Sequence, residues 1–306
     1  MFVNSTTLII PTRNRPQSIN NLLNYFYINK IQFKQFLIID SSDIKYKKYN
    51  YNLVKKLKIK IIKTYPSASH QRNIGLKKVK KNIKYIMFLD DDVIFYKDSF
   101  KNMNQTINKF NKKKNIAGFA FNLINKDKEN YIIKKIKESR LLNFLNLYSI
   151  FPGKVLKSGW HSKIENVKKD IYVEWLFSGA TIYKKKFIKK MRFNTSLGSY
   201  SYLEDLFFSH EVFKKGFNLI VSKNGKFRNP NFVERSNFEF GFKEVINRYK
   251  FVKKFNLNKM LFLINCFFRF IKSFIQIFKF KINYLMRSIG NIYGIITILF
   301  NLYEKK

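Results

Sequence analysis

The chain has 306 residues, of which 46% are hydrophobic and 18% aromatic, and its formal net charge is +41. This length and composition suit one large α/β domain or one domain with an appendage, and they argue against a disordered chain. A single cysteine, Cys266, excludes an internal disulfide framework and a cysteine-based zinc site. The first apolar run, Thr7 to Ile10, is too short for a secretory signal and is stopped by Pro11, so we expect an intracellular, reducing compartment.

The positive charge suggests nucleic acid or an anionic membrane as a partner, because 60 Lys and Arg residues face 19 Asp and Glu residues. The abundance of Lys, Asn, Ile, Phe and Tyr offers a second explanation, the codon bias of an AT-rich genome. No acidic residue occurs between Glu244 and Glu304. The basic excess is therefore partly a property of the C-terminal segment. No recognised nucleic-acid motif accompanies it, and we expect no nucleic-acid partner.

From residue 6 to about residue 122, short apolar runs alternate with longer amphipathic segments, as in βα units around a mostly parallel sheet. The predicted strands are 7–10, 36–39, 59–62, 85–89 and 116–121, and the predicted helices are about 17–29, 70–81 and 98–111. Polar loops follow the first, second and fourth strands, at 11–15, 40–43 and 90–92. Ligands of open α/β sheets bind beyond the carboxyl ends of the strands, so these loops are expected to converge on one crevice.

Three adjacent carboxylates, Asp90, Asp91 and Asp92, form the third of these loops. Like charges side by side repel by roughly 1 kcal/mol or more per pair, so the triplet indicates a site for a hard divalent cation such as magnesium or manganese. A solvated acidic turn after a strand is the alternative interpretation.

Phosphate-binding glycine loops are missing from the sequence. Neither G-x-G-x-x-G nor G-x-x-x-x-G-K-[ST] occurs, which argues against a Rossmann dehydrogenase and a P-loop ATPase. A phosphate would then be held by a metal with basic side chains such as Arg13, Arg15 and Arg72, although each of these arginines alone is also explained as a surface charge.

The segment from about 123 to 240 is less regular and contains two notable stretches. The apolar run 173–180 closes on the small residues Ser178, Gly179 and Ala180, where a backbone can approach a ligand closely. Glu204 and Asp205 open a predicted helix that runs to about residue 215. Acidic residues at a helix N-terminus also stabilise the helix dipole, which is a purely structural explanation for this pair.

Taken together, these residues resemble a family 2 glycosyltransferase with the GT-A fold, of the bacterial surface-polysaccharide type. The resemblance covers about residues 6–230 and rests on six segments in the family's order: 8–15, 38–43, 72–75, 88–92, 178–180 and 204–205. It implies a Rossmann-like α/β domain at 1–240 with a mostly parallel central sheet flanked by helices. Residues 1–122 would bind the nucleotide sugar, 123–240 would bind the acceptor, and 241–306 would form a C-terminal helical extension.

The resemblance also implies a donor site for a UDP-, GDP- or dTDP-sugar. The base and ribose would contact Pro11, Thr12, Asn14, Arg15 and Asp40, and the segment with Arg72 and Asn73 would order the site. The D-x-D motif falls on Asp90 and Asp92, with Asp91 between them. Asp92 would ligate Mg²⁺ or Mn²⁺ directly, and Asp90 would contact ribose or a metal-bound water. The metal would act as a Lewis acid on the leaving nucleoside diphosphate.

Asp205 falls on the family's catalytic base, which removes a proton from the acceptor hydroxyl as that oxygen attacks the anomeric carbon. Aspartate is a weak base at its ordinary pKa near 4, so a position beside a cleft and the neighbouring Glu204 would help to raise the pKa of Asp205. Trp175 and Gly179 fall where the family shapes its acceptor pocket, although a tryptophan in an apolar stretch is also a common core residue.

One departure from the family pattern concerns the metal. Many GT-A enzymes supply a further ligating histidine at a place that corresponds here to Arg228 and Asn229, and this chain has none there. His210 has a spacing that suits packing rather than ligation. Asp92, diphosphate oxygens and water would then hold the metal, as magnesium's habit of retaining water allows.

From Leu261 onward, polar residues recur every three or four positions on an otherwise apolar helix: Asn265, Arg269, Lys272, Gln276, Lys279, Asn283 and Arg287. Such a lopsided amphipathic helix suits the interface of an anionic membrane. Packing on the catalytic domain is the alternative, and charges interrupt every window long enough to span a bilayer. We expect a protein that is cytoplasmic, peripherally attached to the inner face of the cell membrane, and active on a glycan or polyprenyl-linked acceptor.

Three other functions are alternatives to an inverting glycosyltransferase. A sugar-phosphate nucleotidylyltransferase typically carries a glycine-rich, lysine-containing loop near its first strand, which this chain lacks. A non-enzymatic nucleic-acid-binding protein would lose affinity steeply with salt. An inactive relative is disfavoured by the retained Asp92 and Asp205. The sequence does not identify the sugar, the nucleotide, the acceptor, the linkage or the oligomeric state.

Overall fold

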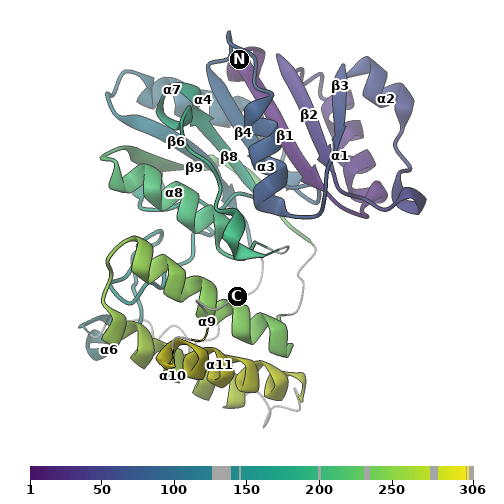
Figure 1. Cartoon of the computed structure of the whole chain (residues 1–306). Coiled ribbons are helices and arrows are strands. Elements are labelled where there is room, and N and C mark those ends of the chain that lie inside the picture. Colours follow the sequence, from purple (N-terminus) through teal and green to yellow (C-terminus); the bar gives the residue numbers. More distant parts are fainter. Residues whose placement is uncertain are drawn as a thin grey trace. The chain divides into compact units, whose positions relative to one another are not determined.

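The computed structural model describes residues 1–125, 139–144, 146–198, 201–230, 235–275, 282–300 and 302. The chain divides into two compact units (Figure 1). The first unit comprises Met1–Lys126 with Ile164–Asn231, and the second comprises Asp127–Lys163 with Phe232–Lys306.

The first unit is built around one sheet with the strand order β3-β2-β1-β4-β8-β6-β9-β5, and β7 pairs with β9. Pairing is parallel from β3 to β4 and between β6 and β9, whereas β8 runs antiparallel to both β4 and β6. The strands are β1 (Thr6–Thr12), β2 (Gln35–Asp40), β3 (Ile59–Lys63), β4 (Tyr85–Leu89), β5 (Ile94–Phe95), β6 (Ile116–Leu123), β7 (Ile171–Val173), β8 (Ala180–Lys184) and β9 (Asn218–Arg228).

Helices connect these strands and cover the sheet. They are α1 (Pro16–Ile28), α2 (Tyr51–Lys56), α3 (Ala68–Lys77), α4 (Ser99–Asn111), α7 (Lys185–Ile188) and α8 (Glu204–Lys214), with short 3-10 turns at Phe2–Ser5, Ile44–Tyr46 and Thr195–Leu197. The predicted α/β class is confirmed. The sheet is parallel through its first four strands, as expected, and mixed beyond them. The predicted strands and helices before residue 122 all form.

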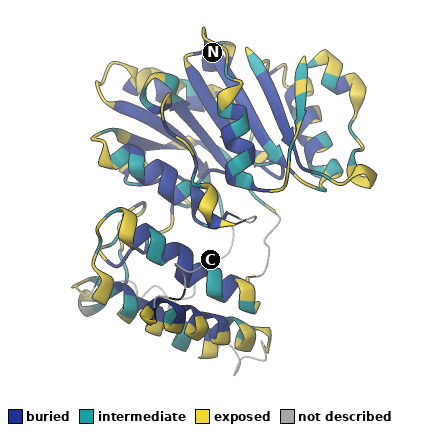
Figure 2. Cartoon of the chain, in the orientation of Figure 1, coloured by how far each residue is buried: buried dark blue, intermediate teal, exposed yellow. Residues whose placement is uncertain are grey.

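Successive side chains of β1 point to opposite faces of the sheet, and both faces are covered. Leu8 and Ile10 join the main core, which includes Phe26 of α1 and Phe100 of α4, while Ile9 points to the opposite face and meets α3. Figure 2 shows the central strands largely buried, whereas the edge strand β3 is partly exposed. Such a doubly covered sheet requires the near-continuous apolar runs that the sequence carries.

Helix α3 lies unusually close to β1, and this contact places the helix at the carboxyl end of the sheet. A Cβ atom on Gly75 would come within 2.5 Å of a methyl group of Ile9, so only glycine fits without a shift. One turn earlier, the Gln71 amide donates to the main-chain oxygens of Thr12 and Ile39 at 3.0 and 2.7 Å. These bonds tie α3 to the ends of β1 and β2.

The second unit contains α6 (Arg140–Phe144), α9 (Phe238–Lys254), α10 (Lys259–Ile275) and α11 (Asn283–Leu299). Its core is formed by buried residues from the 146–163 segment and from the three long helices: Trp160, Val245, Ile246, Val252, Phe262, Cys266 and Ile298. Within the described part of the chain, no helix has the length and apolar character needed to cross a membrane.

The C-terminal segment differs from the single helix expected from Leu261 onward, because α10 and α11 lie side by side, with the Ser273 hydroxyl 3.4 Å from the Asn291 side-chain oxygen. Gln276 and Lys279 of the predicted polar stripe lie outside the described residues. The functional division predicted at residue 240 stays a prediction. By contacts, Trp160 and its neighbours belong with the C-terminal helices rather than with the sheet.

Candidate active site

The Asp triplet lies at the end of β4, where β4 meets the antiparallel strand β8. Asp90 is half-buried, and Asp91 and Asp92 are buried. The backbone N–H of Asp90 donates to the oxygen of Gly179 at 3.0 Å, which fixes the triplet beside the small-residue stretch before β8. The triplet is therefore not a solvated turn.

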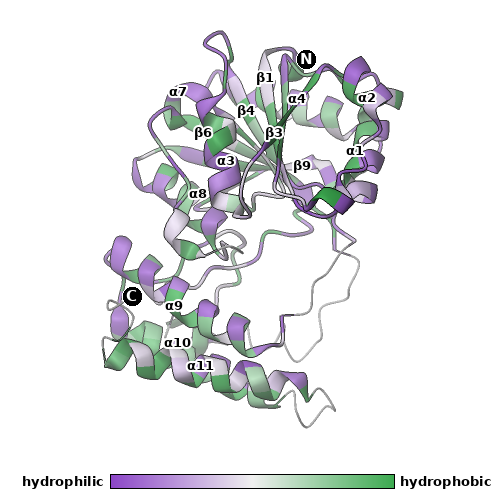
Figure 3. Ribbon diagram, turned by 45° about the vertical axis from the view of Figure 1, so that its right-hand side comes forward, coloured by the Kyte–Doolittle hydropathy of each residue, from purple (hydrophilic) through white to green (hydrophobic). Residues whose placement is uncertain are grey.

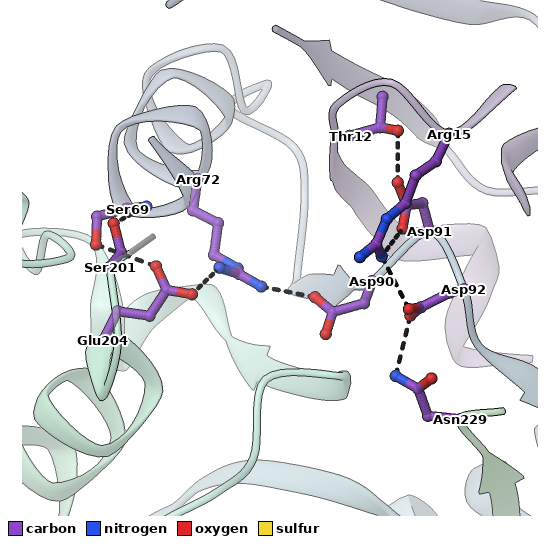
Figure 4. Close-up of polar contacts among 10 residues, drawn as sticks. All are labelled: Thr12, Arg15, Ser69, Arg72, Asp90, Asp91, Asp92, Ser201, Glu204 and Asn229. Atoms are coloured by element: carbon purple, nitrogen blue, oxygen red, sulfur yellow. Dashed lines mark hydrogen bonds and ion pairs between the residues drawn. The ribbon is translucent and has the colours of Figure 1, made fainter. Parts of the chain in front are cut away.

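Each aspartate of the triplet has its own partners (Figure 4). The Thr12 hydroxyl, at the end of β1, donates to Asp91 at 2.5 Å. Arg15 places one nitrogen 3.1 Å from Asp91 and 2.8 Å from Asp92. Burial raises the pKa of Asp91 to about 6, although Thr12 and Arg15 both act to lower it. The predicted convergence of the first and fourth loops on one site is thus observed.

Asn229 completes the surroundings of Asp92. It follows β9, and its side-chain nitrogen lies 3.0 Å from the second oxygen of Asp92. The sequence pointed to this position only as the place of a missing histidine. His210 lies elsewhere, on α8, buried with its Nδ1 3.1 Å from the main-chain oxygen of Glu174.

The side chains around Asp92 could serve a hard divalent cation only after a rearrangement, because Arg15 and Asn229 both direct nitrogen atoms at its carboxylate. An amide carries a carbonyl oxygen as well as its NH₂ group, and rotation of the Asn229 amide would offer that oxygen to a cation held by Asp92. Mg²⁺ and Mn²⁺ prefer such oxygen ligands. In the described part of the chain, no three His, Cys, Asp or Glu side chains form a complete metal cluster.

Arg72 links the triplet to α8. It lies on α3 with only 3% of its side chain exposed, and it binds Asp90 at 2.7 Å with one nitrogen and Glu204 with another. Burial acts to lower the pKa of this guanidinium, but Glu204, Asp90 and Asp205 outweigh it and raise the pKa above its usual value. Asp90 therefore faces an arginine in this structure, and its contact with ribose or a metal-bound water stays a prediction.

Glu204 and Asp205 begin α8 after a turn in which Ser201 and Leu203 have a left-handed backbone. Leu203 has φ of 75°, a costly conformation for a bulky residue, and strain of this kind often occurs at functional sites. The turn brings Glu204 within reach of Arg72 and of the Ser69 hydroxyl, which donates to it at 3.0 Å.

The two carboxyl groups of α8 have raised pKa values. Burial is the largest cause for both, and it raises the pKa of Glu204 to about 7 despite the opposing effect of Arg72. The pKa of Asp205 is also raised by burial, against hydrogen bonds from the N–H groups of Leu206 and Ser178. Asp205 is half-buried, so it is the more accessible of the two groups. A raised pKa makes either carboxylate a stronger base than an ordinary one.

The loop after β2 meets the loop after β1, as predicted. The Asn14 side chain donates to Asp43 at 2.9 Å and accepts from the N–H of Asp43 at 2.9 Å. Asp40 is 2% exposed and accepts from the Ser42 N–H at 2.8 Å, but its Oδ2 is buried with no partner within hydrogen-bond distance among the described residues. Burial and the nearby Asp40 raise the pKa of Tyr49. An unsatisfied buried oxygen is costly and is expected to meet a ligand donor.

Other predicted residues take structural positions. Asn73 both donates to and accepts from the backbone of Phe193, at 2.9 and 2.8 Å, so its amide holds the fold rather than facing the site. Trp175 is only 5% exposed and is mainly a core residue here. Pro11 is half-buried within β1, and Arg13 is exposed. The acceptor role of Trp175 stays a prediction.

A parallel half-sheet, an acidic loop at the end of β4 and a carboxylate pair at the start of α8 together match the GT-A fold that the sequence predicts. Comparisons with known proteins agree. The description "Glycosyl transferase family 2" matches residues 7–163, which is just over half of the chain. The protein belongs to this family and is a glycosyltransferase. No curated protein matches the sequence.

Several solved structures share the fold. The mannosyltransferase PcManGT from Pyrobaculum calidifontis, in complex with GDP-Man and Mn²⁺, has 12% identity and a TM-score of 0.58, over 99% of this chain and 88% of that one. S. aureus TarS 1–349 has 15% identity and a TM-score of 0.51, over 86% and 71%. GalNAc-T7 with UDP, GalNAc and Mn²⁺ has 12% identity and a TM-score of 0.54, over 82% and 48%. At these identities the likeness shows the fold alone.

Proposed function

We propose that the protein transfers a sugar from a nucleoside diphosphate sugar to a glycan or polyprenyl-linked glycan with inversion at the anomeric carbon. The observation that carries the proposal is Arg72, which binds both the Asp triplet and Glu204 and so joins the donor end of β4 to the start of α8. Two of the similar solved structures contain a nucleotide or nucleotide sugar together with Mn²⁺, which supports the same class of donor for this protein.

The donor would lie across the carboxyl ends of β1, β2 and β4. Asp40 offers its unpartnered Oδ2 to a donor group of the base or ribose. Asp92 and Asn229 would hold Mg²⁺ or Mn²⁺, and Arg15 would turn from Asp92 toward the phosphates, which a guanidinium matches well. When bound, the metal supplies Lewis-acid stabilisation of the negative charge on the departing diphosphate.

Asp205 would act as the general base. Its carboxylate takes the proton of the acceptor hydroxyl while the acceptor oxygen forms a bond to the anomeric carbon. The bond from that carbon to the diphosphate oxygen breaks, and the nucleoside diphosphate leaves with the electron pair. One displacement inverts the configuration, so a single carboxylate suffices. Glu204, held by Arg72 and Ser69, would position α8 rather than exchange protons with the acceptor.

The test measures nucleoside diphosphate release from UDP-, GDP- and dTDP-sugars in Mn²⁺, with water as the acceptor. We expect release from one nucleotide class, a loss of at least about a hundredfold in Asp205→Asn, and unchanged nucleotide binding in that variant. Glu211→Gln, also on α8, is the matched control and should keep the wild-type rate. Full activity in Asp205→Asn would exclude Asp205 as the base. No release from any donor, together with no nucleotide binding, would overturn the transferase proposal.

A further inference from the structure

The last two helices expose apolar side chains in stripes. On α10 the exposed apolar residues are Met260, Ile264, Phe267, Phe268, Phe274 and Ile275, whose positions at 100° per residue fall on one side of the helix. On α11 the exposed apolar residues are spaced one or three positions apart: Leu285, Met286, Ile289, Ile292, Tyr293, Ile296 and Leu299. Each stripe therefore covers one side of its helix. Single exposed apolar residues are ordinary, but two continuous stripes of this length are not.

The buried side of α11 consists mostly of small and polar residues. It consists of Ser288, Gly290, Asn291, Gly294, Thr297 and Ile298. A Cβ on Gly290 would lie 2.2 Å from the main-chain oxygen of Phe238, and a Cβ on Gly241 would lie 2.2 Å from that of Arg287. The Asn291 amide donates to the oxygen of Gly241 at 3.0 Å. Helices α9 and α11 thus pack backbone to backbone, as helices do in a lipid environment.

The polar residues of α10 and α11 are largely turned inward as well. Asn265 is 2% exposed and donates to Ser158 at 3.1 Å. Arg269 lies over the ring of Trp160. Arg287 binds the buried Glu244 at 2.8 Å. Lys272 and Asn283 of the predicted stripe remain exposed. The sequence suggested a cationic face toward headgroups, but three of its five described residues, Asn265, Arg269 and Arg287, have partners inside the second unit.

This polarity is the opposite of that of an amphipathic helix in water. Figure 3 shows strong apolar colouring along α10 and α11, and Figure 2 shows exposed positions along both helices. Lys253 and Lys254 are exposed at the end of α9 and Lys259 is exposed at the start of α10, and no acidic residue follows Glu244 until Glu304.

We infer that the apolar stripes of α10 and α11 form a surface that inserts into one leaflet of an anionic lipid bilayer without crossing it. The stripes would lie among acyl chains, while the lysines at 253, 254 and 259 contact anionic headgroups. The inference concerns the second unit only, so it goes beyond the proposed transfer reaction and does not depend on it. Charge complementarity favours a lipid partner over a second copy of this strongly basic chain.

The test is sedimentation of the full chain with vesicles of phosphatidylcholine mixed with phosphatidylglycerol. The wild type should sediment with the vesicles, and high salt should weaken but not abolish binding, because the apolar contact is insensitive to screening. The double variant Phe267→Ser and Phe268→Ser should weaken binding about tenfold or more for each phenylalanine lost. The matched control, Tyr27→Ser with Ile28→Ser, removes two exposed apolar residues of α1 and should bind as the wild type does.

A second measurement places the stripe directly. A spin label at Phe268→Cys should be shielded from aqueous relaxation agents and accessible to oxygen in vesicles, whereas one at Lys254→Cys should remain accessible to water. Cys266 is fully buried and would not compete for the label. Wild-type protein that stays in the supernatant would overturn the inference. Vesicle binding by the Phe267→Ser and Phe268→Ser variant that equals wild-type binding would also overturn it. So would a change of that variant from dimer to monomer that leaves vesicle binding unaffected.

Discussion

Replacing Arg72 with methionine tests the buried link between the Asp triplet and α8. The guanidinium is 3% exposed and holds two carboxylates, so its loss leaves Glu204 buried without its cationic partner. Removing one partner of a buried ion pair costs about 3–5 kcal/mol. We expect the free energy of unfolding of Arg72→Met to fall by that amount at about pH 8, where a group with a pKa of about 7 is ionised.

The same variant should be less impaired at lower pH. The folded pKa of Glu204 lies above its ordinary value, so the folded state prefers the protonated carboxyl. The stability that protonated Glu204 gives the folded state is present below the ordinary pKa of a glutamate, and it is lost as the pH rises through the pKa of Glu204 in the folded protein. Without Arg72 the preference grows, and the deficit of Arg72→Met should shrink as the pH falls to about 5.

Urea unfolding followed by circular dichroism measures these changes. Lys77→Met, at the exposed end of the same helix, is the matched control and should change stability by less than about 0.5 kcal/mol. The double variant Arg72→Met with Glu204→Gln should recover part of the loss, with a coupling of about 1–3 kcal/mol. Strictly additive effects, or a deficit that is the same at both pH values, would refute the reasoning.

Three further predictions concern other parts of the chain. Asn229→Ala should weaken Mn²⁺-dependent nucleotide binding roughly 10–100-fold by calorimetry, and an unchanged affinity would remove Asn229 from the metal site. Gly290→Ala should lower thermal stability by about 1–3 kcal/mol because its methyl group meets the Phe238 carbonyl, whereas the exposed Ile289→Ala should not. For Glu244, burial acts to raise the pKa, but Arg287, Arg269 and Arg248 lower it overall. The stability that Glu244 contributes to the fold is therefore present above its usual pKa of 4.5 and is lost as the pH falls. Acid titration of Glu244→Gln should show a flatter loss of stability, and an unchanged acid profile would argue against this ion cluster.

The strands and the convergence of the polar loops after β1, β2 and β4 could be predicted from sequence, because apolar runs and the polar loops after them are local signals. Asp90 to Asp92 and Glu204 to Asp205 carry their chemistry in consecutive residues. The side chains that bind these carboxylates could not be predicted in the same way. Arg72 is one of many basic residues, and only the packing of α3 on β1 through Gly75 brings it between Asp90 and Glu204.

The sequence also could not show which side of α10 and α11 faces the rest of the protein. Periodicity along α10 and α11 shows which residues share a face, but it does not say which face points to the protein. That choice depends on distant groups, since Glu244 attracts Arg287 and Gly241 admits the backbone of α11. The role of Asn229 was also hidden, because an asparagine near a strand end has no distinctive pattern and is noticed only beside Asp92.

The most direct test of the transferase proposal is calorimetric titration of UDP, GDP and dTDP into the detergent-solubilised protein, with and without Mn²⁺. We predict metal-dependent binding of one nucleotide, its loss in Asp92→Ala, and its retention in Asp205→Asn. Equal binding with and without the metal, or full binding in Asp92→Ala, would contradict a donor site built on the Asp triplet.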